Sequence, residues 1–252
     1  MTERSNELKN PMLAAQQKAR PEFPKRFYKK AGFAKSGDGY AIQLDGKQAR
    51  TPGRAPLVVT SRPLAEALTA EWEAQVDIID PRTMPVTRIV NAAVDGVASR
   101  MAEVRANIVA YAGSDLICYW AVTPDSLVAR QAAAWSPLLD WAKTELGAQL
   151  VSEQGIAHRA QDSESLSAID RALAGYDPIN LAALHTMTTL TGSAVLALAV
   201  AKGRLTAGEA WSAAHIDEDW QMEKWGEDLE AAKRRATRWK EMAAAALILG
   251  WE

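Results

Sequence analysis

Residues 211–239, WSAAHIDEDWQMEKWGEDLEAAKRRATRW, form the stretch around which the chain is organised. Its apolar residues recur at alternating steps of four and three, which is the spacing of one face of an α-helix. This face comprises Trp211, His215, Glu218, Met222, Trp225, Leu229, Ala232, Ala236 and Trp239. Apart from His215 and Glu218 it is apolar. The spacing therefore predicts a single helix that packs this face against the rest of the protein.

The charged residues of the same stretch are separated by sign. Seven acids and a single base, Lys224, lie between Asp217 and Glu230, whereas residues 233–240 hold five bases and no acid. Early acids and late bases match the helix dipole, so a solvated surface helix would explain the pattern without any partner. Trp220, however, lies off the apolar face beside Asp219, and tryptophan among surface charges is typical of a protein contact. The acids would favour a basic partner.

The overall composition is that of a globular protein. The 252 residues are 48% hydrophobic and 24% charged, with a net charge of -2 and a pI near 6.0. This balance argues against nucleic acid as the main ligand, since phosphate binding requires clustered positive charge. The single cysteine, Cys118, excludes an internal disulfide bond and a metal site made of cysteines alone. We expect it to be a buried apolar residue.

Membrane and targeting signals are not evident in the sequence. The longest apolar run, residues 194–201, ends at Lys202, far short of the roughly 18 residues that a membrane-spanning helix needs. The N-terminus has no secretory apolar region, and Glu3 and Glu7 are unusual for a transit peptide. We therefore expect a soluble, intracellular protein.

Residues 1–24 are polar and interrupted by prolines, which predicts a flexible tail, and residues 1–35 hold nine bases against three acids. Residues 25–86 predict a β-rich N-terminal domain with one helix. Apolar and polar residues alternate there, and Gly37-Asp38-Gly39 and Asp45-Gly46 are typical hairpin turns. The domain is expected to end in an extended segment, because each proline of residues 80–85 keeps the residue before it out of the helical conformation.

The one helix of this domain is predicted to begin after Ser61, an expected N-cap, with Pro63 in its first turn. The residues that share its inner face are Leu64, Leu68, Trp72 and Gln75. Trp72 is therefore expected to be buried, and Trp72 and Gln75 are predicted to have structural roles.

Residues 87–252 predict an all-helical C-terminal domain. The expected helices cover residues 125–135, 137–146 and 164–174, followed by a long apolar helix from Pro178 to Ala201 that Asp177 would cap. Thr206 and Glu209 form a capping box for the helix of residues 211–239. Strands come first and helices second, with no βαβ alternation, so the predicted class is α+β with a helical C-terminal bundle.

Residues suited to catalysis are few. His215 and Asp219 are four apart and could share a helix face as metal ligands, with Glu218 and Glu223 nearby, which leaves a metal-dependent hydrolase open as an alternative. No glycine-rich phosphate loop is present, and Ser193 lacks the second glycine of a nucleophile elbow. The carboxylates of residues 217–230 lie on a charged helix face rather than in an apolar pocket. We predict no catalytic residue, cofactor or metal.

The order and spacing of several short blocks resemble the chaperone family that assembles the catalytic head of F-type ATP synthase by handling its α subunit. The resemblance covers about residues 26–252. The blocks are Arg26-Phe27-Tyr28-Lys29, Leu44-Asp45-Gly46-Lys47, Thr51-Pro52, Glu71-Trp72 with Gln75, Ile79, Pro81, Met84-Pro85, Asn91, Asp95, Asp115-Leu116 with Cys118-Tyr119, Trp135 with Pro137-Leu138-Leu139, and Gln221 with Trp225-Gly226. Trp120 and Ser136 differ from the arginine and the acid usual in that family.

The resemblance implies a non-enzymatic chaperone with a small β-rich domain followed by a helical domain. It implies that the chain binds the unassembled α subunit, covers its β-facing surface and is replaced by the β subunit. The family's functional acid would lie in the helix with the Gln-x-x-x-Trp-Gly element. The residues expected to bind the partner are accordingly Asp217, Glu218, Asp219, Trp220, Gln221, Glu223, Trp225, Gly226 and Glu227.

We expect a monomer, located in the bacterial cytoplasm or, in a eukaryote, in the mitochondrial matrix. A nucleotide would belong to the client and not to this chain. The remaining alternative is a helical adaptor with unrelated partners, which co-purification would distinguish from the chaperone.

Overall fold

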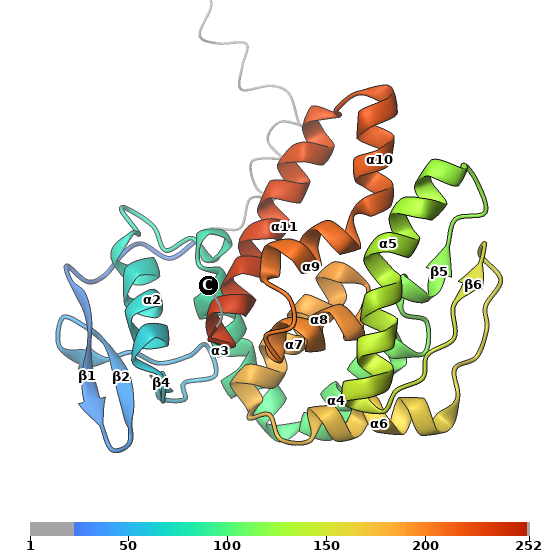
Figure 1. The fold of residues 1–252 in the computed structure, drawn as a ribbon. Coiled ribbons are helices and arrows are strands. Elements are labelled where there is room, and N and C mark those ends of the chain that lie inside the picture. The colour runs from blue at the N-terminus through green and yellow to red at the C-terminus, as the bar shows by residue number, and fades with distance from the viewer. Residues whose placement is uncertain (1–22, 251–252) are drawn as a thin grey trace, which may run out of the picture.

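The computed structural model describes residues 23–250. At one end of the molecule an antiparallel sheet is formed by β1 (Ala31–Ser36), β2 (Gly39–Leu44), β3 (Lys47–Gln48) and β4 (Val58–Val59) (Figure 1). Strand β2 is central and pairs with the other three. The predicted turn at Asp45-Gly46 is confirmed: both residues have positive φ, 49° and 75°, as the hairpin turns with this sequence require. The tail predicted for residues 1–24 lies almost wholly outside the described residues.

Helix α2 (Arg62–Glu73) packs on this sheet. It begins as predicted: the Ser61 side chain accepts the backbone N–H of Leu64, and Pro63 lies in the first turn. Leu64 and Leu68 are buried between helix and sheet. Trp72, on the same face, is only half-buried, so the expectation that it is buried was wrong. Its side chain lines a surface pocket together with Tyr28 and Leu44, which leaves the ring partly open.

The segment that joins the two parts is helical rather than extended. A 3₁₀ helix covers Pro81–Thr83, and helix α3 (Pro85–Asp95) follows it. The residues before both prolines are indeed outside the α conformation, but each proline then occupies the first turn of a helix, where its missing N–H costs nothing. The half-buried Glu71 carboxylate of α2 accepts the N–H groups of Val86 and Thr87 at 2.8 and 2.7 Å, and so ties α2 to the start of α3.

The rest of the chain forms a helical body. Its remaining helices are α4 (Met101–Ala112), α5 (Asp125–Trp141), α6 (Ser163–Leu173), α7 (Pro178–Thr191), α8 (Ala194–Ala201), α9 (Ala207–Ala214), α10 (Ile216–Trp225) and α11 (Leu229–Ile248). Short 3₁₀ helices cover Val97–Ser99 and Leu116–Cys118. Helices α7 and α8 lie at the centre (Figure 1), and residues 194–200 of α8 are all buried. A helix that is apolar all round is expected in such a position.

The helical body differs from the sequence prediction in three details. Residues 125–146 form one helix that runs through Pro137 and continues as a π-helical turn, Ala142–Leu146, up to Gly147. Pro137 is exposed and removes only one backbone bond, while its neighbours Trp135 and Leu138 are buried and hold the helix in place. The apolar helix predicted for residues 178–201 is divided at Gly192, which has a φ of 71°. A parallel strand pair, β5 (Tyr119–Trp120) and β6 (Glu153–Gln154), was not predicted.

The stretch from Trp211 to Trp239 is not one helix but parts of three. The His215 Nδ1–H donates to the Trp211 carbonyl at 2.7 Å, and the His215 backbone N–H turns instead to Ser212, which ends α9. Gly226, with a φ of 88°, ends α10. Asp228 then caps α11 by accepting the N–H of Glu230 at 2.8 Å. The apolar face predicted for one helix is therefore distributed over α9, α10 and α11.

The α+β class is confirmed, with the sheet confined to the N-terminal part and helices beyond it. One continuous cluster of buried hydrophobic residues extends from Tyr28 to Ile248 and so includes both parts. The division at residue 86 stays a prediction. Within residues 23–250, the helices that the structure contains are too short or too polar to cross a bilayer.

Candidate protein-binding site

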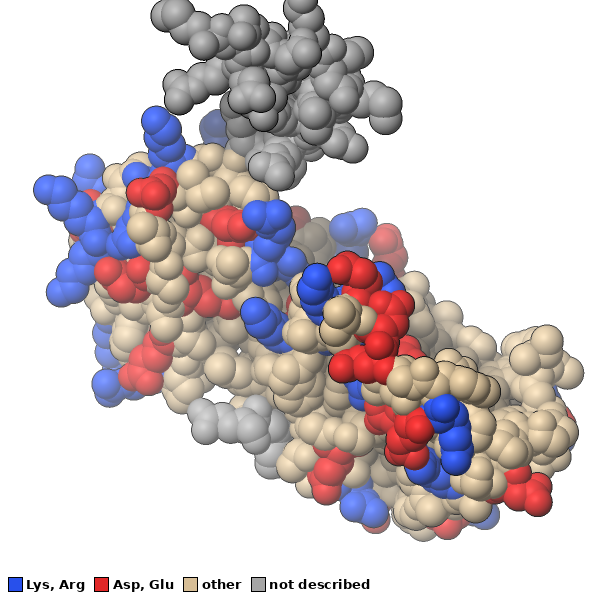
Figure 2. Space-filling model, turned by 90° about the horizontal axis from the view of Figure 1, so that it is seen from above, with Lys and Arg blue, Asp and Glu red and all other residues tan. Residues whose placement is uncertain are grey.

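Helices α10 and α11 leave the helical body together as an antiparallel hairpin (Figure 1). Helix α10 packs on α5, and the second half of α11 packs on α3 and α7, so the two helices are anchored to different parts of the protein. The turn between them, residues 226–228, is the outermost part of the hairpin in the view of Figure 1. Viewed from above, this end of the molecule carries a band of acidic side chains, whereas lysines and arginines gather over the sheet (Figure 2).

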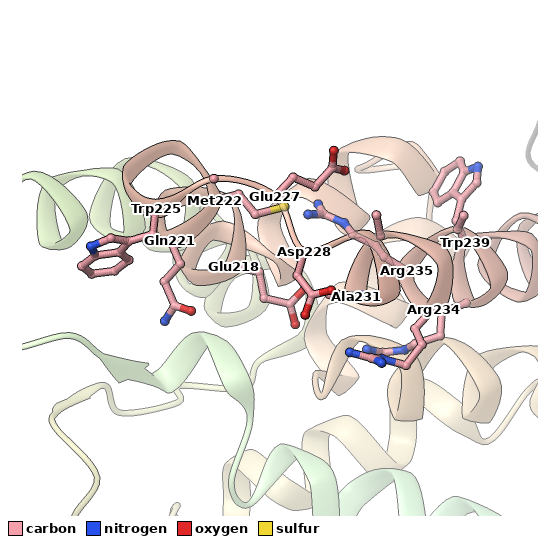
Figure 3. Close-up of a pocket in the computed structure, with 14 residues that line it drawn as sticks. Glu218, Gln221, Met222, Trp225, Glu227, Asp228, Ala231, Arg234, Arg235 and Trp239 are labelled. Carbon is pink, nitrogen blue, oxygen red and sulfur yellow. Dashed lines mark hydrogen bonds between the residues drawn. The ribbon is translucent and has the colours of Figure 1, made fainter.

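A groove of about 740 Å³ lies between α10 and α11 (Figure 3). Its apolar walls come from Met222 and Trp225 on α10, and from small alanines followed by Trp239 on α11. Trp225 is 77% exposed, and Leu229, at the start of α11, is 72% exposed. The single helix predicted from the sequence would pack both side chains, but the break at Gly226 places them at the end of the hairpin. Two large apolar side chains this exposed in one turn are typical of a binding surface.

Three of the predicted acids are already engaged within the protein. Glu223 binds Arg130 of α5 through two hydrogen bonds of 2.8 and 2.9 Å, and Asp219 forms an ion pair with Arg235 of α11. Asp217 accepts a hydrogen bond of 2.6 Å from the Gln131 side chain. The guanidinium of Arg130 lowers the pKa of Glu223 below its ordinary value. These acids therefore hold α10 in position as well as contributing charge.

Glu218 and Glu227 are the predicted acids that remain available. Both line the groove and are exposed, and within residues 23–250 neither forms an ion pair with lysine or arginine. Glu218 has a distant contact of 4.0 Å to His215 Nε2. Arg234, on the opposite wall, also has no ion-pair partner among the described residues. The groove thus has acidic side chains on α10 and in the following turn, and a basic side on α11.

The other predicted residues of this helix are distributed on both sides of it. Trp220 faces α5, where its Nε1–H donates to Ser126 at 3.3 Å, and its ring meets that of Trp225 edge to face at 5.7 Å. Trp220 therefore partly enters the core, which we had not expected. Gln221 is exposed at the groove, and Gly226 closes α10. The helix brings the nine predicted residues close together, but only part of them faces the groove.

The metal-site alternative finds little support in the geometry. His215 is buried, stacks on Trp211 at 4.0 Å and donates from Nδ1 to a carbonyl, while Asp219 faces Arg235. Burial lowers the pKa of His215. Residues 23–250 contain no cluster of three or more His, Cys, Asp or Glu side chains suited to a metal ion. His185 is also engaged, through Nε2 and the Asn107 side chain at 2.8 Å.

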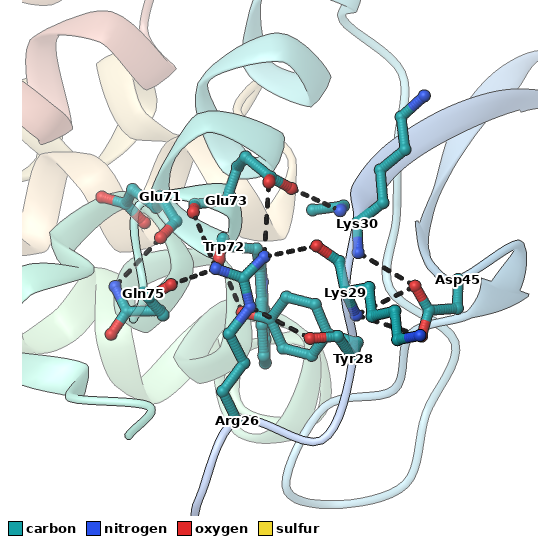
Figure 4. A network of polar contacts seen from close by, with 10 residues as sticks. Arg26, Tyr28, Lys29, Lys30, Asp45, Glu71, Trp72, Glu73 and Gln75 are labelled. Carbon is teal, nitrogen blue, oxygen red and sulfur yellow. Dashed lines mark hydrogen bonds and ion pairs between the residues drawn. The ribbon is translucent and has the colours of Figure 1, made fainter. Parts of the chain in front are cut away.

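Trp72 and Gln75 lie in a separate polar network at the end of α2 (Figure 4). Arg26 donates to the carbonyls of Tyr28 and Lys29 on one side and to those of Glu73 and Gln75 on the other. The Tyr28 hydroxyl donates to the Trp72 carbonyl at 2.6 Å, and the two rings meet edge to face at 5.7 Å.

The Gln75 side chain is buried, and its carbonyl oxygen accepts the Asp80 N–H at 2.8 Å. Its amide donates to the Glu71 carbonyl at 3.0 Å. This network joins the first described residues to α2 and to the segment before α3.

Sequence reasoning missed Arg130, Arg235 and the exposure of Leu229. Arg235 follows its partner Asp219 by 16 residues, and Arg130 precedes its partner Glu223 by 93 residues. Residues this far apart in the sequence show no local spacing from which the pairs could be predicted. The exposure of Leu229 did have a signal, since Gly226 and Asp228 are typical of a helix end and a helix start.

Comparison with known proteins agrees with this architecture. The model of the ATP12 chaperone protein family matches residues 25–143. A mitochondrial atp12 protein of Schizosaccharomyces pombe is 23% identical over 218 residues, which cover 82% of this chain and 75% of that protein.

Two solved structures are more similar. A putative chaperone from Agrobacterium tumefaciens is 50% identical, with a TM-score of 0.87 over 96% of this chain and 91% of that one. Atp12 from Paracoccus denitrificans is 40% identical, with a TM-score of 0.83 over 90% of this chain and 97% of that one. From the fold, the sequence identity and the coverage together, the chain belongs to the ATP12 chaperone family.

Proposed function

We propose that this chain is an assembly chaperone for the catalytic head of F-type ATP synthase. It binds the unassembled α subunit and covers the surface that later meets the β subunit. The observation that supports this most directly is the α10–α11 hairpin, where Trp225 and Leu229 are exposed beside the acids Glu218 and Glu227. Exposed apolar side chains with charges around them suit a partner whose own apolar surface is temporarily uncovered.

The two kinds of side chain have different tasks in this proposal. Trp225 and Leu229 supply apolar contact area, the main source of binding free energy in protein interfaces. Glu218 and Glu227 attract a basic surface and speed the encounter, an effect that salt weakens. Release follows when the β subunit competes for the same surface of the client, so no chemical step is needed.

We expect this function to involve no catalysis, metal or cofactor of the chain itself. The residues best suited to a metal, His215 and Asp219, are engaged by a carbonyl and by Arg235. Protein washed with a chelator should therefore contain no stoichiometric zinc or manganese in elemental analysis. We further propose a monomer that acts where the enzyme's head is assembled, in the bacterial cytoplasm or the mitochondrial matrix.

Co-purification tests this proposal. The tagged chain is expressed with the α subunit alone, with the β subunit alone, and with both. We expect recovery of α when it is expressed alone, and loss of α from the chaperone when β is added. Recovery of β in preference to α, or of assembled heads, would contradict the proposal. A client-aggregation assay with purified α gives the same comparison without other cellular proteins.

A further inference from the structure

Helices α10 and α11 do not cover each other's apolar faces. Helix α10 is fixed to α5 by the Glu223–Arg130 pair and the Asp217–Gln131 hydrogen bond. Helix α11 is fixed to the body on its other half, in part by the pair of Arg88 and Glu241 at 2.7 Å. The ion pair of Asp219 with Arg235 is the polar link that the described residues make directly between them. The groove between them therefore keeps an open apolar floor.

The size and lining of this groove fit a helix. Helix α10 has 10 residues, which corresponds to about 15 Å at a rise of roughly 1.5 Å per residue, or nearly three turns. Ala232 and Ala236 are small and allow a backbone to approach closely, whereas Met222 is flexible and adapts to the side chains that it meets. A helix laid between two helices with its apolar face down is a common mode of peptide recognition.

The charges of the groove define the flank of such a helix. Glu218 lies on α10 and Glu227 in the turn that follows it, and within residues 23–250 neither has a lysine or arginine partner. Their charges are therefore available to a basic ligand. An acidic flank would be repelled at the same place, so the acids also restrict which apolar helices can bind.

We propose that the groove between α10 and α11 holds one amphipathic helix of the client. Its apolar ridge contacts Met222, Trp225 and the alanines of α11, and lysine or arginine side chains beside that ridge face Glu218 and Glu227. This inference rests on the proposed function, because it takes the unassembled α subunit as the source of the helix. It adds the secondary structure and the charge pattern of the bound segment.

Blocking the groove after folding tests this directly. The Ala236→Cys variant places a thiol in the groove, and Ala243→Cys places one at an exposed position two turns further along α11, outside the groove. The native Cys118 is 1% exposed and should not react in the folded protein. Each folded variant is labelled with a bulky, environment-sensitive maleimide dye, so the substitution itself stays small.

We expect the label at 236 to weaken binding of the α subunit by at least about tenfold, and the label at 243 to leave it unchanged. The unlabelled Ala236→Cys protein is measured beside the labelled one, so that the effect of the dye is separated from the effect of the substitution. Equal affinity of the two labelled proteins would overturn the groove inference while leaving the chaperone proposal intact. Failure of the wild-type protein to bind α at all would instead refute the proposed function.

Model peptides test the charge pattern without the α subunit. One helical peptide carries a leucine ridge flanked by lysines, and its matched control carries glutamates at the flanking positions. We expect the lysine peptide alone to bind wild-type protein, and to bind more weakly when salt is added. The double variant Glu218→Lys, Glu227→Lys should prefer the glutamate peptide. Equal binding of both peptides to both proteins would show that these acids do not select the ligand.

Discussion

Replacing Asp115 with asparagine should be tolerated better at neutral pH than in acid. Asp115 is fully buried, and its carboxylate accepts the N–H of Ile117 at 3.3 Å and of Val195 at 3.1 Å. It thereby joins the 3₁₀ helix Leu116–Cys118 to the start of α8. Burial nevertheless outweighs these hydrogen bonds and raises the pKa of Asp115 from 3.8 to about 6.

The sign and size of the effect follow from this pKa. A carboxyl group with a raised pKa stabilises the fold while it is protonated, below its unfolded value, and loses that contribution as the pH rises through the folded value. A difference of about 2 pKa units, at 1.36 kcal/mol each, corresponds to about 3 kcal/mol of unfolding free energy, lost between roughly pH 4 and pH 6. Asparagine cannot ionise, so the unfolding free energy of the Asp115→Asn variant should not show this loss.

Urea unfolding followed by circular dichroism measures this at a series of pH values. The difference in unfolding free energy between Asp115→Asn and wild type should move in favour of the variant by about 3 kcal/mol across that window. Asp140→Asn, at an exposed position of α5, is the control for removing one carboxylate. If the difference for Asp115→Asn is the same in acid and at neutral pH, the N–H donors keep this group ionised and the reasoning is wrong.

Three further predictions concern the two ends of the molecule. Trp72→Arg should lower the unfolding free energy by about 2 to 4 kcal/mol, because the half-buried indole is replaced by a charge; a wild-type thermal midpoint would exclude a packing role. Glu71→Gln should cost about 1 to 3 kcal/mol in urea unfolding, because the amide cannot accept both N–H groups that begin α3. An unchanged unfolding midpoint would show that the start of α3 does not need this acceptor. Glu227→Lys should keep the wild-type melting temperature and weaken client binding, whereas Glu223→Lys should lower the melting temperature as well, since the new lysine would face Arg130. Identical melting of these two variants would show that the Glu223 pair does not hold α10 on α5.

Local sequence signals predicted those elements whose ends are set by neighbouring residues. Ser61 with Pro63, and Thr206 with Glu209, begin helices as expected because a cap needs only the backbone of the next turn. Gly226 and Asp228 are equally local signals, for a helix end and a helix start. The apolar periodicity that continues across them nevertheless predicted a single helix. Pro137 shows the opposite case: a local signal for a helix break was overridden by tertiary burial of Trp135 and Leu138.

The candidate site divides in the same way. The sequence by itself determined that acids and tryptophans gather between Asp217 and Glu227, and the family resemblance followed from the order of short blocks. Only the tertiary structure decided which of these side chains remain available. The fold brings Arg130 to Glu223 and Arg235 to Asp219, and leaves Glu218, Glu227 and Trp225 open at a groove. Helical periodicity records which residues share a face, but it contains no information about which distant segment covers that face.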